Sequence, residues 1–560
     1  MDYYEYYEAI IPEERTRFNF FYTRLNKMLL EWNKFIFQNE FRTENSWVYL
    51  FEFIKCALID IIAEFCPKDQ KTILKSHSWC LEYKEILFNT LLKYRKKSLI
   101  GWCFLQCSYF LQENANIRLL NSELLKNMDF IIEKGKIYET VDEIYLDPLL
   151  VIFSPLYSLS YRNQNNKDLF LKRNQTYLSM CPDLKYDGVN GRKINDSKLT
   201  IGFISDFLTK DSSVLRDRMG IIENLDSEKF NVKILTSIDP DKINGVISKN
   251  FYERNKDKFV IMPRKISDSR KMIADLNLDV LVYCEIGMAV KSFLLSFSRL
   301  APIQINTWGH SDTSGNSEID YFISSKLFET ENGEQNYSEK LIKLDSLGTY
   351  YYSPKSQFLE STNNSNRKNF NLPEDKFLIG CIQTKFKISN EFENIIKNIL
   401  EQNENCLIYL SNFVEFNRKH LERIKKKLGD NFNRLQFIRG MDTKEYLSLL
   451  QNFDIVLDPY PFGGCNTSLE AFDFDIPVVT FPTKYLNGRF TQGFYKLMEI
   501  ESLCAKDEND YVDIVNKLVN DKEYLQNTKD LINQKKNILF QQENSNKDWE
   551  EFLLSLKNKE

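Results

Sequence analysis

The chain has 560 residues, which is too long for one ordinary hydrophobic core, because domains usually contain about 100–200 residues. Apolar residues make up 43% and charged residues 27%, a balance typical of a globular chain and not of a disordered or collagen-like one. The 74 Lys and Arg residues are offset by 79 Asp and Glu residues, and a net charge of −5 creates no field that attracts nucleic acid. We therefore expect two to four folded domains and no nucleic-acid partner.

The histidine and cysteine contents exclude two further classes of protein. Only three histidines occur, His77, His310 and His420, so a multi-histidine metal site is not expected. The 11 cysteines are odd in number, are scattered singly and include no C-x-x-C pair, which is typical of buried thiols in a reducing compartment. The N-terminus is acidic, unlike a signal peptide, and no stretch offers about 18–20 uninterrupted apolar residues. We expect a cytoplasmic protein without a membrane span.

Residues 1–185 predict an all-helical N-terminal domain. They contain few Gly and Pro, and apolar residues recur at intervals of three and four over residues 18–30, 81–92 and 117–132, which is helical periodicity. No convincing 34-residue helical-hairpin register is present. An irregular helical domain is therefore expected, and a degenerate repeat array is the alternative.

The pattern changes near residue 186, where short apolar runs begin to alternate with helical stretches. The predicted strands form one set before the polar linker at 360–368 and a second set after it: 198–206, 232–235, 259–262, 280–283, 303–307 and 321–323, then 377–382, 406–410, 435–438, 455–457 and 478–481. Such alternation predicts parallel, doubly wound sheets. We expect an α/β protein with one Rossmann-like lobe at 186–365, a second at 366–540 and a C-terminal helix within 541–560.

The segment at residues 457–470 carries the strongest chemical signal. It leaves a strand, passes through a Pro-rich turn and enters a helix, and it reads Leu457-Asp458-Pro459-Tyr460-Pro461-Phe462-Gly463-Gly464-Cys465-Asn466-Thr467-Ser468-Leu469-Glu470. The Gly pair lets the backbone approach a ligand closely. Asn466 or Thr467 can cap the helix, whose free N–H groups bind phosphate, and Glu470 lies one turn further on, where it can accept hydrogen bonds from ribose. The pattern favours nucleotide binding over ordinary loop chemistry.

This segment, with Asp475-Ile476-Pro477-Val478-Val479-Thr480 after it, resembles the C-terminal lobe of the O-GlcNAc transferase and SPINDLY family. It is most similar to the bacterial members and the adhesin N-glucosyltransferases. Further matches to the family lie upstream, in Glu285-Ile286-Gly287-Met288, Arg299-Leu300-Ala301-Pro302-Ile303-Gln304, Trp308-Gly309-His310, Thr313-Ser314-Gly315 and Asp320-Tyr321. The resemblance covers roughly residues 160–540 and gives no support to the N-terminal third.

The resemblance implies a GT-B glycosyltransferase fold, in which the second lobe holds most of the nucleotide-sugar and a protein acceptor enters between the lobes. Carried over by position, it implies that nucleotide-sugar is bound by Gly309, Gln383, Met441, Tyr446, Gly464, Cys465, Asn466, Thr467 and Glu470. It also places His310 near the sugar and the diphosphate. By the same analogy, the helical N-terminal domain would dock the acceptor or a partner protein.

Lys387 matches the family's lysine that neutralises the diphosphate. The departing nucleoside diphosphate gains charge as the bond to the sugar breaks, and a fixed cation stabilises that change. Lys385 is the alternative if the register is shifted by two residues, and a solvated surface lysine is the structural alternative.

One departure from the family lies in the loop after the first strand of the α/β part, which reads Ser205-Asp206-Phe207-Leu208-Thr209-Lys210-Asp211-Ser212-Ser213-Val214-Leu215. Relatives carry a His in this loop, and here there is none. Asp211 can serve as the base in its place, or the substrate itself can assist proton loss. The departure also fits lost activity or a different acceptor.

Other motifs favour structural roles. The strings Asp239-Pro240-Asp241 and Asp473-Phe474-Asp475 resemble metal-binding pairs but lie at a surface turn and at a helix end, so no metal and no cofactor is expected. His77 with Cys80 lacks two further ligands, and His420 lies on a charged helix surface.

Three functions remain open. The leading one is an inverting, metal-independent glycosyltransferase that moves one hexose or N-acetylhexosamine from a UDP-sugar, either UDP-GlcNAc or UDP-glucose, to a protein side chain, with GDP-fucose as another possible donor. The second is a non-catalytic GT-B partner or chaperone of an active transferase. The third is a lipid or small-molecule glycosyltransferase of the same fold, which would need an apolar acceptor groove.

Overall fold

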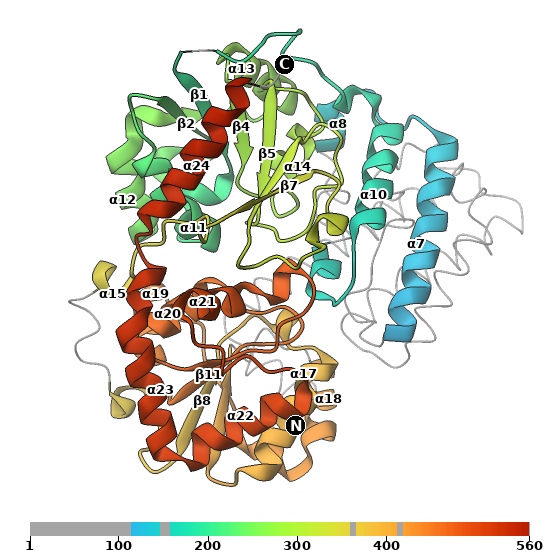
Figure 1. Ribbon diagram of the computed structural model, residues 1–560. Coiled ribbons are helices and arrows are strands. Elements are labelled where there is room, and N and C mark those ends of the chain that lie inside the picture. The colour runs from blue at the N-terminus through green and yellow to red at the C-terminus, as the bar shows by residue number, and fades with distance from the viewer. Residues whose placement is uncertain (1–113, 146–156, 196, 359–365, 412–417, 559–560) are drawn as a thin grey trace, which may run out of the picture.

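The computed structural model describes residues 114–145, 157–195, 197–358, 366–411 and 418–558, which form a helical region and two α/β lobes (Figure 1). The helices predicted at 18–30 and 81–92 and the side chains of His77 and Cys80 lie outside these residues, as does most of the predicted linker.

The described part of the helical region contains α7 (Asn114–Lys134), α8 (Val141–Tyr145), the 3-10 turn η1 (Tyr157–Tyr161), α10 (Lys167–Met180) and η2 (Pro182–Leu184). Helices α7 and α10 lie side by side (Figure 1). The ring of Tyr177 on α10 packs edge-on against Phe293 of the first lobe, with ring centroids 5.1 Å apart. A continuous apolar core therefore fastens this helical pair to the first lobe.

The first lobe is built on a seven-stranded parallel sheet with the order β3-β2-β1-β4-β5-β6-β7. Its strands are β1 (Leu199–Ile204), β2 (Phe230–Thr236), β3 (Phe259–Ile261), β4 (Val280–Tyr283), β5 (Ile303–Thr307), β6 (Tyr321–Ser325) and β7 (Lys340–Leu344). Its helices are α11 (Ser213–Asn224), α12 (Val246–Asn255), α13 (Ile266–Asp275), α14 (Val290–Leu295) and the short α15 (Pro354–Gln357). Strands β1 and β4 are mostly apolar, β5 alternates Ile with polar residues, and all three are almost wholly buried because helices cover both faces of the sheet.

The second lobe is built on a five-stranded parallel sheet with the order β10-β9-β8-β11-β12. Its strands are β8 (Phe377–Cys381), β9 (Cys406–Leu410), β10 (Leu435–Phe437), β11 (Ile455–Leu457) and β12 (Val478–Val479). Its helices are α17 (Asn390–Gln402), α18 (Arg418–Leu428), α19 (Thr443–Leu450), α20 (Asn466–Asp473), α21 (Phe490–Met498), α22 (Glu508–Asn520) and α23 (Lys522–Lys535). The predicted pair of doubly wound parallel sheets is confirmed.

The C-terminal helix returns from the second lobe to the first. The chain leaves α23, and α24 (Glu543–Ser555) then crosses the first lobe (Figure 1). Trp549 is fully buried there and its indole N–H donates to the carbonyl of Gly348 at 3.0 Å, while Asp548 accepts from the amide of Ser346 at 2.7 Å. The predicted C-terminal helix within 541–560 is thus present and is part of the connection between the lobes.

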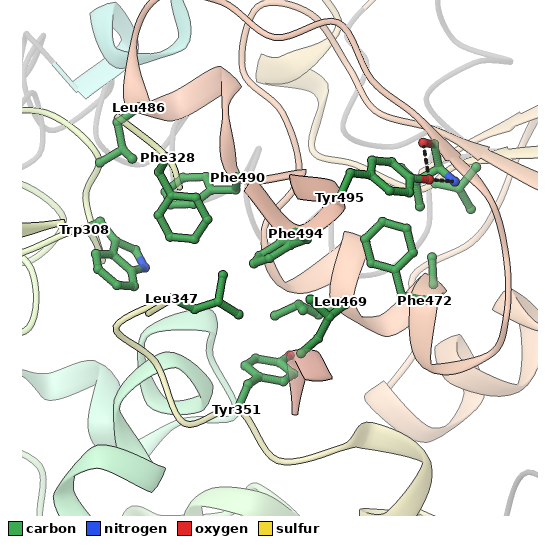
Figure 2. Packing of buried hydrophobic residues seen from close by; sticks show 14 of the residues in the cluster. Trp308, Phe328, Leu347, Tyr351, Leu469, Phe472, Leu486, Phe490, Phe494 and Tyr495 are labelled. Atoms are coloured by element: carbon green, nitrogen blue, oxygen red, sulfur yellow. Dashed lines mark hydrogen bonds between the residues drawn. The ribbon is translucent and has the colours of Figure 1, made fainter. Parts of the chain in front are cut away.

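Aromatic side chains from both lobes meet in one buried cluster (Figure 2). Phe328 of the first lobe packs edge-on against Phe490 and Phe494 of α21, with ring centroids 5.1 and 5.7 Å apart. Trp308 lies against the same Phe490 ring. This shared core holds the loops that follow β5 and β11 in a fixed relation. None of the described helices combines the length and the apolarity that a bilayer crossing requires.

Candidate functional site

The site lies where the second sheet changes the direction of its strand order. Strands β8 and β11 are neighbours at this point, since β9 and β10 follow on one side and β12 on the other. Ligands of doubly wound sheets bind beyond the carboxyl ends of the two strands that flank such a switch point. The loop after β8 carries Gln383 and Lys387, and the loop after β11 carries Gly463 and Gly464. The topology therefore brings the two predicted donor-binding segments together.

Lys387 points toward the glycine pair. Its Nζ donates to the carbonyl oxygen of Gly463 at 2.6 Å and lies 4.7 Å from the centroid of the Phe462 ring. Burial lowers the pKa of Lys387 to about 8, and the nearby carboxylate of Asp458 opposes that shift. Lys385, by contrast, lies over the ring of Phe386, which is 42% exposed. Lys387 is thus the lysine of this loop that reaches the turn before α20.

A buried carboxylate holds the glycine turn. Asp458 accepts hydrogen bonds from the amide of Gly464 and from the hydroxyl of Thr480, the latter at 2.7 Å, while burial raises its pKa. A Cβ atom on Gly464 would lie 2.5 Å from the hydroxyl oxygen of Thr467, so a side chain does not fit there. Gln383 donates to that same hydroxyl at 2.6 Å and ties the β8 loop to the start of α20.

The N-cap of helix α20 lies one residue before the first predicted cap, Asn466. Cys465 occupies the N-cap position and provides no side-chain hydrogen bond, so the prediction that Asn466 or Thr467 caps the helix is wrong. The reason is that their side chains have other partners: Asn466 accepts from the Tyr351 hydroxyl at 2.9 Å and donates to Asp217 at 3.1 Å, and the Thr467 hydroxyl is bound by Gln383.

Backbone N–H groups at the start of α20 are free to donate hydrogen bonds to a ligand. The first amides of a helix have no intrahelical acceptor, and among the described residues no group accepts from the N–H of Asn466 or Thr467. Such amides, at the positive end of the helix dipole, bind phosphate. Together with the ammonium group of Lys387, they form a candidate diphosphate site. Cys465, which is half-buried, is the N-cap residue that precedes this helix.

Glu470 lies one turn into α20 and is fully buried, with only 3% of its side chain exposed. It forms an ion pair with Arg216 of α11 in the first lobe and accepts a hydrogen bond from the hydroxyl of Tyr446. Burial raises the pKa of Glu470, and Arg216 opposes the shift. Met441 and Tyr446 are half-buried at the start of α19 and pack against the core of the second lobe. The predicted ribose and base contacts, Glu470, Tyr446 and Met441, thus lie on two adjoining helix starts.

His310 and Gly309 follow β5 in the first lobe. A Cβ atom on Gly309 would lie 2.3 Å from the carbonyl oxygen of Cys284, so only glycine allows this approach to the end of β4. His310 is buried, which lowers its imidazole pKa, and its Nε2 lies 3.0 Å from the hydroxyl of Ser160 in η1. The structure therefore places His310 against the helical region as well as within the first lobe.

Asp211 is not brought to this group of residues by any contact of the described chain. Its carboxylate accepts from the amides of Ile247 and Ser248, at 3.3 and 2.8 Å, in the first turn of α12. The N-cap of α12 is Gly245, which has no side chain, and a Cβ atom there would lie 2.2 Å from the Asp211 carboxylate. Asp211 thus supplies the cap that Gly245 lacks.

Besides Tyr351 and Asp217, which bind Asn466, sequence reasoning missed Arg216, Ser160 and Asn487 near the predicted site. Arg216 binds Glu470, Ser160 contacts His310, and Asn487 donates to the carbonyl oxygen of Ser160 at 2.7 Å. Each acts across a large sequence separation, so no local pattern marks them. The Ala-Pro-Ile-Gln and Gly-Gly-Cys-Asn-Thr motifs mark only residues at the start of β5 and around the start of α20.

The two Asp-x-Asp strings have structural partners. Asp239 caps the 3-10 turn η4 (Pro240–Lys242). Asp473 accepts from the hydroxyl of Ser353 at 2.8 Å, and Asp475 pairs with Lys536 at 2.7 Å. Across the described ranges, no group of three or more His, Cys, Asp or Glu side chains is arranged to hold a metal ion.

Two doubly wound lobes, with a phosphate-type helix start at the switch point of the second, define the GT-B class of glycosyltransferase folds. A solved structure titled as an O-GlcNAc transferase mutant of Thermobaculum terrenum has the same fold, with a TM-score of 0.61 over 91% of this chain and 98% of that chain at 16% identity. Residues 353–547 match the family described as "Glycosyl transferase family 41". The resemblance to the O-GlcNAc transferase and SPINDLY family is therefore confirmed.

Curated relatives support the same relationship. The chain is 26% identical over 193 residues to a probable UDP-N-acetylglucosamine–peptide N-acetylglucosaminyltransferase, SEC, of Arabidopsis thaliana, which covers 34% of this chain and 20% of that protein. It is also 26% identical over 259 residues to a UDP-glucose:protein N-beta-glucosyltransferase of Actinobacillus pleuropneumoniae, which covers 45% of this chain and 40% of that protein. The chain thus spans 40% or less of the length of these relatives.

Proposed function

We propose that this chain is an inverting glycosyltransferase that moves one hexose or N-acetylhexosamine from a UDP-sugar onto a protein side chain without a metal ion. One observation carries the proposal: the buried ammonium group of Lys387 lies 2.6 Å from the carbonyl oxygen of Gly463, immediately before the open start of α20. A cation and free helix amides at a switch point are suited to a diphosphate.

The chemistry follows from that placement. An acceptor side chain attacks the anomeric carbon and passes its proton to a base of the protein or to the substrate itself, while the bond from that carbon to the diphosphate oxygen breaks. The negative charge that develops on the diphosphate is stabilised by Lys387 and by the amides of Asn466 and Thr467, in the role that a metal ion has in other transferases. Burial strengthens this interaction because little water competes for the charge. We therefore assign Lys387 the largest share of leaving-group stabilisation.

The proposed donor contacts extend along the second lobe. The carboxylate of Glu470 can accept hydrogen bonds from ribose hydroxyls, and Tyr446 and Met441 adjoin it at the start of α19. The names of the Arabidopsis and Actinobacillus relatives specify UDP-N-acetylglucosamine and UDP-glucose as donors and a peptide or protein as acceptor. These names support the same two donors and a protein acceptor for this chain.

We extend the proposal to the helical region and to location. Ser160 of η1 contacts His310, which supports a role of the helical N-terminal domain in docking an acceptor or a partner protein. The scattered cysteines, all free among the described residues, support a cytoplasmic setting.

The proposal is tested with the full chain and three donors, UDP-GlcNAc, UDP-glucose and GDP-fucose. Calorimetry measures the binding of UDP and GDP, and mass spectrometry of an acceptor peptide library measures sugar transfer. We expect UDP to bind, one of the UDP-sugars to add a single sugar, and EDTA to leave the rate unchanged. Failure of all three donors to bind or turn over would refute the proposal, and UDP binding without transfer to any acceptor would favour the non-catalytic partner instead.

A further inference from the structure

The turn η1 lies between the two lobes and touches both. Ser160 within it is 1% exposed, and its hydroxyl lies 3.0 Å from Nε2 of His310 in the first lobe. The carbonyl oxygen of the same residue accepts a hydrogen bond from Nδ2 of Asn487 in the second lobe at 2.7 Å. One buried residue of the helical region therefore joins His310 to the second lobe.

Asn487 continues this connection to Lys387. It lies in the 3-10 turn η11 (Leu486–Gly488) and is 3% exposed, and its backbone carbonyl accepts from the amide of Gly463 at 2.9 Å. The carbonyl of Gly463 in turn accepts from Nζ of Lys387 at 2.6 Å. Four hydrogen bonds thus connect the imidazole of His310 with the ammonium group of Lys387, through one residue of each intervening segment.

Aromatic contacts hold η1 against the same turn of the second lobe. The ring of Tyr161 stacks on Phe462 with centroids 4.7 Å apart, and Phe462 is also the ring that Nζ of Lys387 faces. Asn163, just after η1, donates to the hydroxyl of Tyr460 at 2.8 Å in a more exposed position. The η1 turn is therefore fixed on the Tyr460–Gly463 stretch by packing, while Ser160 and Asn487 make the buried polar connection.

We infer that Ser160 and Asn487 are positioning residues, which hold His310 of the first lobe and the Gly463–Lys387 contact of the second lobe in a fixed relation around one nucleoside diphosphate. The inference rests on the proposed function. Buried hydrogen bonds suit this task because the loss of one partner leaves a desolvated polar group without compensation, so alternative arrangements of η1 are unfavourable.

The test uses the full chain with isotope-labelled histidine, whose three residues give at most three imidazole signals. The signal of His310 is assigned with His310→Gln.

Four variants change the buried connection. Ser160→Ala removes the hydroxyl, and Ser160→Thr keeps it. Asn487→Ala removes the amide donor together with side-chain volume, and Asn487→Asp removes the donor at almost constant volume. Asn163→Ala is the matched control, because it removes a hydrogen bond of the same segment outside the buried path. Each variant is measured by the His310 signal, UDP affinity and thermal unfolding.

We expect Asn487→Ala and Asn487→Asp to shift the signal of His310, to which Asn487 is connected through Ser160, and to weaken UDP binding by about tenfold. Ser160→Ala should produce the same shift, Ser160→Thr should restore it, and Asn163→Ala should leave both readouts as in the wild type. A purely structural role would lower the unfolding temperature without moving the His310 signal of the folded protein.

The outcome also separates the inference from the proposed function. If both Asn487 variants and Ser160→Ala keep the wild-type His310 signal and UDP affinity, while Lys387→Ala loses UDP, the inference is overturned and the proposed function stands. If Lys387→Ala binds UDP as the wild type does, the proposed diphosphate site itself is wrong, and the inference falls with it.

Discussion

Two loops at the carboxyl ends of parallel strands differ in how they use their charged side chains. In the second lobe, the loop after β8 buries Lys387 beside a carbonyl oxygen and the open start of α20. In the first lobe, the loop after β1 carries Asp211, whose two carboxylate oxygens accept amides of α12. The loop after β8 keeps a buried cation beside free helix amides, and the loop after β1 uses its carboxylate to cap a helix.

The difference separates the loop that we propose to bind the donor from a loop with a structural role. Burial of a lysine near a turn works against folding, because the charged form is desolvated and the pKa falls to about 8. A fold that keeps such a group at a ligand-binding position gives up stability for function. The Asp211 carboxylate, by contrast, stabilises the fold, because it accepts hydrogen bonds from amides that Gly245 cannot cap. The four predictions below test this contrast, from the largest effect to the smallest.

The largest effect is expected from Lys387→Ala. It removes the cation that we propose to stabilise the diphosphate, so we expect the transfer rate to fall by about 10³-fold and UDP binding to weaken, with unfolding little changed or improved. The matched control is Lys385→Ala, two residues away over the exposed ring of Phe386, which should keep most of the rate. Steady-state kinetics and UDP calorimetry measure both. A larger loss with Lys385→Ala would show that the register of this loop had been assigned to the wrong lysine.

The strands around these loops were predictable because burial on both faces leaves apolar runs that local inspection detects. Strands β4, β5, β9 and β11 begin and end at the predicted residues. Strand β7 was missed, since Lys340-Leu341-Ile342-Lys343-Leu344 is flanked by polar residues and lies at the edge of the sheet. The fold class followed from this alternation, while the donor site assigned from the motif after β11 stays a prediction.

The second prediction concerns the ion pair between the lobes. Glu470→Ala leaves Arg216, with 11% of its side chain exposed, as a buried charge without its carboxylate partner, so we expect the free energy of unfolding to fall by about 3 kcal/mol. The double variant Arg216→Leu with Glu470→Leu should recover much of that loss, because no unpaired charge remains. Urea unfolding measures all three proteins. A loss below about 1 kcal/mol for Glu470→Ala would contradict the pairing.

The ion pair between Arg216 and Glu470 could not be predicted from the sequence. Glu470 was expected to bind ribose, and its first-lobe partner Arg216 carried no signal of its own. The helix cap was misassigned to Asn466 or Thr467 for the same reason. The side chain of Asn466 is hydrogen-bonded to Tyr351 and Asp217, and that of Thr467 to Gln383. Contacts between residues far apart in the chain depend on how the lobes dock, and local patterns do not report docking.

The third prediction is a pH dependence of donor binding. The pKa of Lys387 is about 8 in the free protein, below its ordinary value of 10.5, so its charge is lost as the pH rises through 8. A bound diphosphate favours the ammonium form, and binding should therefore take up a proton above about pH 8. We expect UDP affinity to fall above that pH by up to about tenfold per unit.

Calorimetry in buffers of different ionisation enthalpy measures this proton uptake, and Lys387→Met is the control that should abolish it. The same lysine makes the free energy of unfolding rise between pH 8 and 10.5, because over that range the unfolded chain binds more protons than the folded one. UDP affinity that stays constant from pH 7 to 10 would contradict the buried position of the ammonium group.

The smallest effect is expected from Asp211→Asn. The amide keeps the shape of the side chain and one acceptor oxygen, so only part of the cap on α12 is lost, and we expect the free energy of unfolding to fall by about 1 kcal/mol or less. Asp211→Ala should lower the free energy of unfolding by more, up to about 2 kcal/mol, because both amides lose their acceptor.

The transfer rates of the two variants decide whether Asp211 only caps the helix. If it does, the transfer rate of the folded protein should stay within about tenfold of the wild type for both variants, and the larger loss of rate should accompany the larger loss of stability. A general base, by contrast, contributes about 10²–10⁴-fold, and Asp211→Asn would remove that contribution at almost no cost in stability. The ratio of rate loss to stability loss therefore decides whether the loop after β1 is structural, as its hydrogen bonds indicate, or also takes the proton of the acceptor.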